Sequence, residues 1–339
     1  MQSPLRAAVI GCGNIARCHF DALQALENVS VTAACDIVPA RAAQAAAHNR
    51  CAAYTDWRTM LDTVPPDVIH ICTPHDLHVE MAVEALRRGI HVLCEKPCAI
   101  TEASLQVLRK AAEQSSAQFG TCFQNRYNPG VLRAKQLLQE QTCGVLQAVK
   151  GDVSWCRGAA YYSDGWHGTK DREGGGVLIN QAIHTLDLLR VLAGARTDTV
   201  SAHVFNDHLK GVIEVEDTAD VRMTFQNGVA GYLHATTAFA CDAKVQIDLF
   251  CEKALLRLEG ADLFLLLPDG SVQRLTKTTA QSTVAKNYWG NGHPALIADF
   301  YRCIRTGEPF AIDAISGGEA VEAFLAAYRS AETDAPVRL

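Results

Sequence analysis

The chain has 339 residues, more than a single hydrophobic core usually organises, so we expect two domains. Its formal net charge of −6, with acidic and basic residues interspersed, argues against nucleic-acid partners, and no apolar run is long enough to predict a membrane span or a signal peptide. Thirteen cysteines without a Cys-x-x-Cys pair indicate thiols in a reducing cytoplasm rather than a disulfide framework.

The first third of the chain alternates short apolar runs with amphipathic stretches. The runs are typical of buried strands, and the amphipathic stretches repeat apolar residues with a helical period. Strands are expected at 6–11, 31–36, 67–74, 91–97 and 117–123, and helices at 15–26, 40–49, 77–89 and 101–115. This alternation predicts a doubly wound parallel sheet of the Rossmann type over residues 1–123.

The pattern changes in the second part of the chain. Short strands follow one another with turn signals such as Asn227-Gly228 and Asp269-Gly270 between them. Strands are expected at 144–155, 199–207, 218–225, 229–238, 244–252, 254–260 and 262–270, and helices at 177–192, 294–307 and 317–330. Residues 124–339 are therefore expected to form an α+β domain with an open, mostly antiparallel sheet, whose C-terminal helices could pack back onto the first domain.

The stretch "AAVIGCGNIARCHFDAL" joins the first predicted strand to the first predicted helix. Gly11 would permit the tight turn, Gly13 would let a pyrophosphate approach the backbone, and Ala16 would allow close packing of helix on strand. Free amides at the start of the helix suit a phosphate. Asp36 ends the second strand, where a carboxylate accepts hydrogen bonds from an adenine ribose and repels a 2′-phosphate. The combination predicts a dinucleotide site that prefers NAD over NADP.

Two further strand ends contribute candidates to the same edge of the predicted sheet. "HICTPH" brings Thr73 to the carboxyl edge, where ligands bind in such folds, and "CEKP" brings Lys96 to the same crevice. A lysine directly after a buried run is costly unless it has a function. Nearby His75 and His78 have a usable metal spacing, but no acid or cysteine set completes a tetrahedral site, so we expect no metal.

The stretch "EGGGVLINQAIHTLDLL" is the third candidate. No packing use is evident for its triple glycine at 174–176. We therefore expect these glycines to let the backbone pass close to a ligand. Asn180, His184 and Asp187 have the spacing of one helical face. We expect His184 to face a ligand, the alternative being an ordinary polar surface of the helix.

Together these motifs resemble the glucose–fructose oxidoreductase, inositol dehydrogenase and rhizopine-catabolism (Gfo/Idh/MocA) family. The resemblance covers essentially the whole chain and rests on "GCGNIA", "TPHDLH", "CEKP", "NRYNPG", "GGGVLINQAIHTLDLL" and "NYWGNGH". It implies a Rossmann domain, a substrate-binding domain with an open mixed sheet, and NAD(P)-dependent oxidation or reduction of sugars and cyclitols. It also implies homodimers or homotetramers that pair through the C-terminal sheet.

The resemblance also implies roles for single residues. Lys96 matches the family's catalytic lysine and His184 its acid/base histidine, while Asn180 replaces a frequent aspartate and is expected to bind substrate. Trp166 is followed by His167 instead of arginine, which again favours NAD. The expected cofactor-binding residues are Gly11, Gly13, Asn14, Ile15, Asp36, Thr73, Pro74, His78, Glu95, Lys96, Asn125, Trp166 and Tyr288. The expected substrate-binding residues are Lys96, Tyr127, Tyr162, Asn180, His184 and His293.

We therefore expect an enzyme that transfers hydride between NAD and a secondary hydroxyl, preferably at carbon 3, of a sugar, glycoside or cyclitol. One alternative is a redox-neutral glycosidase that retains its NAD. Another is a non-catalytic NAD-binding sensor.

Overall fold

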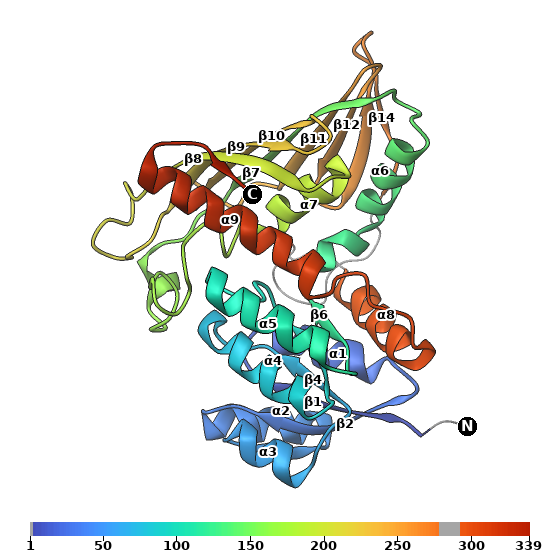
Figure 1. Ribbon diagram of the computed structural model, residues 1–339, viewed down its shortest axis with the longest axis vertical. Helices are drawn as coiled ribbons and strands as arrows, with labels where there is room; N and C mark the ends of the chain where they lie inside the picture. The colour runs from blue at the N-terminus through green and yellow to red at the C-terminus, as the bar shows by residue number, and fades with distance from the viewer. Residues whose placement is uncertain (1–2, 278–291) are drawn as a thin grey trace. The chain divides into compact units, whose positions relative to one another are not determined.

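The computed structural model describes residues 3–277 and 292–339, and the chain divides into two compact units (Figure 1). Unit 1 comprises Met1–Phe123 with Gly292–Gly318, and unit 2 comprises Gln124–Asn291 with Glu319–Leu339. Helix α9 (Ala314–Thr333) begins in unit 1 and continues in unit 2. Within the described ranges, no helix is long and apolar enough to cross a membrane.

Unit 1 is built on a six-stranded parallel sheet in the order β3-β2-β1-β4-β5-β6. Its strands are β1 (Leu5–Ile10), β2 (Val29–Cys35), β3 (Ala52–Tyr54), β4 (Val68–Ile71), β5 (His91–Cys94) and β6 (Phe119–Thr121). Its helices are α1 (Ala16–Gln24), α2 (Pro39–Asn49), α3 (Trp57–Thr63), α4 (His78–Arg87), α5 (Glu102–Gln114) and α8 (His293–Thr306). Strands β1 and β4 carry apolar runs because helices cover parallel sheets on both faces.

The strands of this sheet end in register. Ile10 pairs with Cys35 on one side and with Ile71 on the other, and Ile71 pairs with Cys94. The segments that follow β1, β2, β4 and β5 therefore emerge at one edge of the sheet.

The doubly wound sheet predicted for this part of the chain is confirmed. Two elements were not predicted, β3 and α3, which have three and seven residues and are too short for a clear periodicity. Asp56 accepts a hydrogen bond from the backbone nitrogen of Thr59 (2.7 Å), a cap that marks the start of α3.

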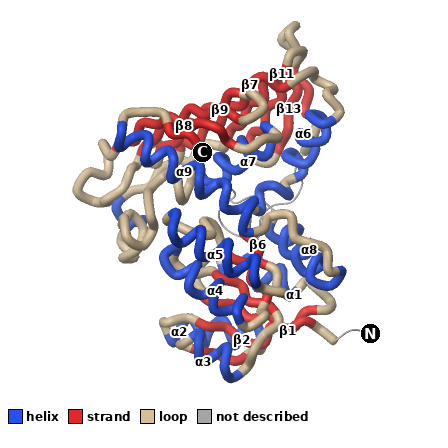
Figure 2. The backbone as a smooth tube through the Cα atoms, in the orientation of Figure 1, coloured by secondary structure: helices blue, strands red, loops and turns tan. Residues whose placement is uncertain are grey.

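Unit 2 is built on a nine-stranded sheet in the order β14-β13-β12-β11-β7-β10-β9-β8-β15 (Figure 2). The β10–β7 pair is parallel and the others are antiparallel, so the predicted open, mostly antiparallel sheet is confirmed. Its strands are β7 (Leu146–Ser154), β8 (Thr197–Phe205), β9 (Thr218–Phe225), β10 (Ala230–Thr236), β11 (Gln246–Cys251), β12 (Leu255–Glu259), β13 (Asp262–Leu266), β14 (Val272–Arg274) and β15 (Val337–Arg338). The helices α6 (Pro129–Gln139) and α7 (Ile183–Ala193) pack on this sheet.

Helix α7 lies against the middle of the sheet. A Cβ atom on Gly151 of β7 would lie 2.6 Å from Thr185 Cγ2 and 3.3 Å from Leu189 Cδ1, so a glycine is needed for this close approach. The helix expected at 177–192 is shorter than predicted, because it begins at Ile183 and the preceding residues form turns. The prediction that Asn180 shares a helical face with His184 and Asp187 is therefore wrong.

Candidate active site

The turn between β1 and α1 has the properties of a phosphate cradle. Gly11 has φ +89°, and a Cβ atom there would lie 2.4 Å from the carbonyl oxygen of Cys72, so the fold itself requires this glycine. A Cβ atom on Gly13 would meet no atom of the described residues within 4 Å. The residue at the helix N-cap, Ile15, makes no side-chain capping bond. Amides at the start of α1 are thus suited to an anionic group, and Asn14 and Ile15 lie in this turn.

Asp36 follows β2 at the same edge and is held by the backbone. Its Oδ2 accepts a hydrogen bond from the backbone nitrogen of Cys12 and its Oδ1 one from that of Val38, both at 2.8 Å. Each carboxylate oxygen has a second acceptor site. Asp36 is thereby fixed beside the glycine turn in an orientation suited to a ribose diol, and the cradle and this carboxylate together fit an NAD molecule.

The segments after β4 and β5 are joined by His78. Its Nε2 lies 2.9 Å from the carbonyl oxygen of Thr73 and its Nδ1 lies 2.7 Å from that of Pro97. Pro74 and Lys96 are therefore in segments that this side chain links, and the Lys96–Pro97 peptide is cis. Both ring nitrogens of His78 thus face backbone carbonyls of the protein, and the expected contact of His78 with the cofactor stays a prediction.

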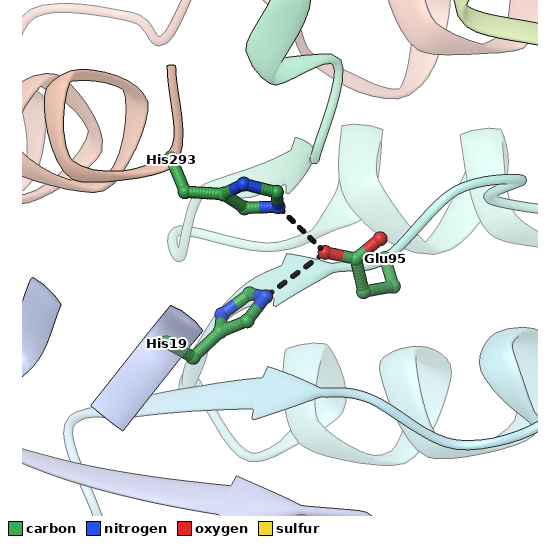
Figure 3. Close-up of side chains that lie close together, drawn as sticks. All are labelled: His19, Glu95 and His293. Atoms are coloured by element: carbon green, nitrogen blue, oxygen red, sulfur yellow. Dashed lines mark hydrogen bonds and ion pairs between the residues drawn. The ribbon is translucent and has the colours of Figure 1, made fainter. Parts of the chain in front are cut away.

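Glu95 lies inside unit 1 in a cluster with His19 and His293 (Figure 3). Its Oε1 is 2.9 Å from His19 Nε2 and 3.4 Å from His293 Nε2. Burial alone raises the pKa of the Glu95 carboxyl, but hydrogen bonding to His19 and His293 outweighs it and holds that pKa well below its ordinary value. His293 was expected to contact a sugar and Glu95 the cofactor; the structure shows their contacts with each other, and both expected roles stay predictions.

The triple glycine of unit 2 has a packing function that sequence reasoning missed. A Cβ atom on Gly175 would lie 2.0 Å from the Tyr328 hydroxyl, and one on Gly176 would lie 1.9 Å from the carbonyl oxygen of Glu216. The buried Glu216 carboxylate accepts hydrogen bonds from the backbone nitrogens of Gly176 (2.9 Å) and Leu178 (3.0 Å). These glycines therefore do have a packing use, contrary to the prediction, because they let the chain pass close to Glu216 and Tyr328.

Asn180 follows this glycine segment and is oriented by a buried acid. Its Nδ2 donates to Glu173 Oε1 (2.6 Å) and lies 3.2 Å from the Tyr161 hydroxyl. Because a carboxylate only accepts hydrogen bonds, Nδ2 must face Glu173. Neither Glu173 nor Tyr161 was predicted, and only the adjacent tyrosine, Tyr162, was chosen from the pair.

His184 lies in the first turn of α7, in contact with a short helical turn at Gln124–Tyr127. Gln124 Nε2 is 3.3 Å from His184 Nε2. In the same turn, Arg126 makes two hydrogen bonds to the buried Asp187 carboxylate, at 2.7 and 2.5 Å. Asp187 thus anchors the turn beside His184, and it does not form a polar surface.

The remaining expected residues are distributed over unit 2. Tyr127 and Asn125 lie in the turn that contacts His184. Tyr162 packs against Leu209, Ile213 and Val215, and burial raises its pKa to about 12. The rings of Trp166 and His167 are in tilted contact, with centroids 3.7 Å apart, and Tyr288 lies outside the described residues.

Comparison with known proteins gives two matching family models. The first, an oxidoreductase family with an NAD-binding Rossmann fold (GFO_IDH_MocA), matches residues 5–123, and the GFO/IDH/MocA C-terminal domain matches residues 131–257. The chain belongs to the GFO/IDH/MocA oxidoreductase family. The predictions of this family, of an NAD-dependent oxidoreductase and of NAD as its cofactor are confirmed.

Several GFO/IDH/MocA relatives span the full length of the chain. D-Glucoside 3-dehydrogenase of Escherichia coli (strain K12) is 30% identical over 364 residues, covering 99% of this chain and 98% of that protein. The WlbA dehydrogenase of Chromobacterium violaceum, solved with NADH and UDP-GlcNAcA, is 28% identical with a TM-score of 0.86, covering 100% of this chain and 97% of that one. A levoglucosan dehydrogenase, solved with NADH and levoglucosan, has a TM-score of 0.90 at 22% identity, covers 99% of each chain and shares the fold.

Proposed function

We propose that the protein oxidises a secondary hydroxyl of a sugar, glycoside or cyclitol with NAD, preferably at carbon 3 of a hexopyranoside. The full-length similarity to a D-glucoside 3-dehydrogenase carries this proposal. The similarity to a dehydrogenase solved with NADH and a nucleotide sugar supports the same class of substrate. The phosphate cradle beside Asp36 supports the cofactor.

In the proposed site, the Gly11–Ile15 turn binds the pyrophosphate and Asp36 binds the adenine ribose. Bound NAD supplies the acceptor for the hydride that leaves the sugar carbon. Lys96 holds the reacting hydroxyl and stabilises the developing alkoxide, and His184 accepts the hydroxyl proton. Asn180 orients the sugar, with its own amide group held by Glu173. The roles of Lys96, His184 and Asn180 are supported by the family resemblance of their motifs.

The test is reduced-nicotinamide absorbance with a panel of free sugars, glycosides, nucleotide sugars and cyclitols. We expect one group to react, and Lys96→Ala and His184→Ala to lower kcat by about 10²-fold or more with little change in NAD affinity. Lys110→Ala on α5 and His208→Ala in unit 2 remove exposed side chains of the same types and serve as controls. Wild-type turnover retained in both active-site variants would refute the assignment. Release of a leaving group without net NADH would identify redox-neutral chemistry instead.

We propose in addition that two copies of the chain pair through the open face of the unit 2 sheet. Phe205, Tyr232 and Phe250 are 43, 44 and 39% exposed there, although they lie on central or long strands. Tyr232 pairs across the strands with Arg222 and Lys150, which favours a specific polar and aromatic contact. Light scattering should give an oligomer for the wild type and a smaller species for Tyr232→Asp, and a monomeric wild type would contradict the proposal.

The compartment that we propose is the cytoplasm. All thirteen cysteines lie in the described residues, and none of them forms a disulfide.

A further inference from the structure

We propose that Glu95 is a positioning residue that holds the segment carrying Lys96, and that His19 and His293 keep it in place. This rests on the catalytic role proposed for Lys96. The three side chains, termed the Glu95 cluster, are buried inside unit 1 and come from the end of β5, from α1 and from the start of α8. The two imidazoles converge on one carboxylate oxygen (Figure 3).

The hydrogen bonds of the Glu95 cluster can be followed proton by proton. The carboxylate only accepts, so His19 Nε2 carries the proton that it donates to Glu95 (2.9 Å). Burial lowers the pKa of His19 despite the nearby carboxylate, so the ring is neutral and its Nδ1 is an acceptor. His70 Nδ1, 2.7 Å away, must then donate to it, and His70 Nε2 accepts from the Tyr301 hydroxyl at 3.0 Å.

In this series of hydrogen bonds, each donated proton therefore has one acceptor. All the bonds are donated in the same direction, from Tyr301 towards Glu95. Burial also holds the pKa of His70 well below its ordinary value, which agrees with the neutral ring that this arrangement needs. The buried hydrogen bonds that join Tyr301, His70, His19 and Glu95 restrict the positions of these side chains. The consequence is a Glu95 side chain with little freedom to rotate.

Lys96 is restrained on both sides as a result. Its backbone nitrogen lies 3.3 Å from Glu95 Oε2, the oxygen that does not face His19. On the other side, the carbonyl oxygen of Pro97 is 2.7 Å from His78 Nδ1. Histidines thus hold the residue before Lys96 and the residue after it. Positioning matters for a group that must meet a reacting hydroxyl, because a shift of about 1 Å can cost about 10²-fold in rate.

A metal ion is the alternative occupant, because the three ligand atoms lie within 4.8 Å of one another. In a metal site the ligand atoms point at a common centre between them. Here both imidazole nitrogens point at the carboxylate oxygen itself, at hydrogen-bonding or ion-pair distance. The geometry favours a hydrogen-bonded cluster over a metal centre.

Two substitutions of His19 separate the positioning function from general stability. The amide nitrogen of His19→Gln reaches the position of Nε2 and can still donate to Glu95, whereas the amide of His19→Asn reaches only the position of Nδ1, which faces His70. His19→Gln loses the hydrogen bond to His70, and His19→Asn loses the hydrogen bond to Glu95. Each variant therefore loses one of the two hydrogen bonds of His19, so we expect similar losses of stability. His293→Gln and His293→Asn form a second pair, should either His19 variant fold poorly. His91→Gln is the matched control: His91 begins the same strand, and its Nδ1 accepts a hydrogen bond from the backbone nitrogen of Gln118.

We expect His19→Asn to lower kcat by about tenfold or more and His19→Gln by about threefold at most, with NADH affinity within about threefold in both. Hydrogen exchange of a peptide covering residues 94–99 should be faster in His19→Asn than in His19→Gln or His91→Gln. Equal kcat and equal exchange in the paired variants would overturn the proposal, as would one equivalent of zinc retained by the purified protein. The exchange measurement needs no substrate, so it tests the Glu95 cluster even if no sugar reacts and the proposed function fails.

Discussion

The packing around His184 can be tested quantitatively by breaking the buried ion pair between Arg126 and Asp187. The Asp187 side chain is 1% exposed and that of Arg126 is 12% exposed, and two hydrogen bonds join them. Removing one partner of a buried pair typically costs about 3–5 kcal/mol, because it leaves a buried charge unpaired. Arg190 remains 3.4 Å from Asp187, so Arg126→Leu should cost about 3 kcal/mol, at the lower end of that range.

A double-mutant cycle in urea measures this coupling. Arg126→Leu and Asp187→Leu should each destabilise the protein, and the double variant should recover part of the loss because it leaves neither charge unpaired. The expected coupling free energy is about 2 kcal/mol, larger than an exposed pair provides. Arg6→Leu is the control, since Arg6 also makes two side-chain bonds to an aspartate, Asp67, but with side chains 48% and 34% exposed.

The control should cost about 1 kcal/mol or less. Arg126→Leu should also lower turnover, because its turn carries Gln124 against His184. A cost below about 1 kcal/mol for Arg126→Leu, or strictly additive free energies in the cycle, would refute the reasoning.

Three further outcomes are expected. Gly13→Ala should change the free energy of unfolding by no more than about 0.5 kcal/mol from that of the wild type but weaken NAD binding about tenfold. Titration of NADH fluorescence would report the affinity, and an unchanged affinity would argue against a phosphate at this turn. Gly176→Ala should lower the free energy of unfolding in urea by about 3 kcal/mol, because its Cβ would meet the Glu216 carbonyl. Gly158→Ala, with no described neighbour within 4 Å, is the control and should be almost neutral. Equal losses of stability in the two variants would contradict this prediction. Burial holds the pKa of His70 below that of the unfolded chain, 6.5, so protons bind preferentially to the unfolded state below that pH. Stability should therefore fall as pH drops from about 6.5, by up to about 1.4 kcal/mol per pH unit for this group, and thermal melts of His70→Gln should show a smaller slope; an unchanged slope would count against a neutral buried ring.

The parts of the fold that could be predicted are those with local signals. The parallel sheet of unit 1 follows from buried apolar runs alternating with helical periodicity, and the antiparallel sheet of unit 2 follows from closely spaced runs and turns such as Asn227-Gly228. Strands β14 and β15, with three and two residues, have no such signal. Helix α7 begins later than predicted because apolar residues before Ile183 are buried in turns, so burial there did not imply a helix.

The parts that could not be predicted depend on contacts between distant residues. His19 meets Glu95 across 76 positions, and His70 meets Tyr301 across 231 positions. His19, His70 and Tyr301 have the sequence signal of ordinary core residues, and the CEKP motif that contains Glu95 does not indicate which side chains contact it. Their function becomes visible only when the sheet brings the end of β5, helix α1 and helix α8 together.

The glycines illustrate the same difference at one residue type. Gly13 and Gly176 both lie in glycine-rich segments that precede a predicted helix, and both were interpreted as positions where a ligand approaches the backbone. The space around each distinguishes them: a side chain at Gly176 would collide with Glu216, whereas a side chain at Gly13 would extend into a space that no described residue fills. Open space at a glycine is not sufficient by itself, because Gly158 also has no described neighbour within 4 Å; at Gly13 the space lies beside the amides at the start of α1 and near the Asp36 carboxylate. The β1–α1 turn therefore remains the predicted phosphate site, whereas the triple glycine of unit 2 makes a close contact with Glu216 and Tyr328.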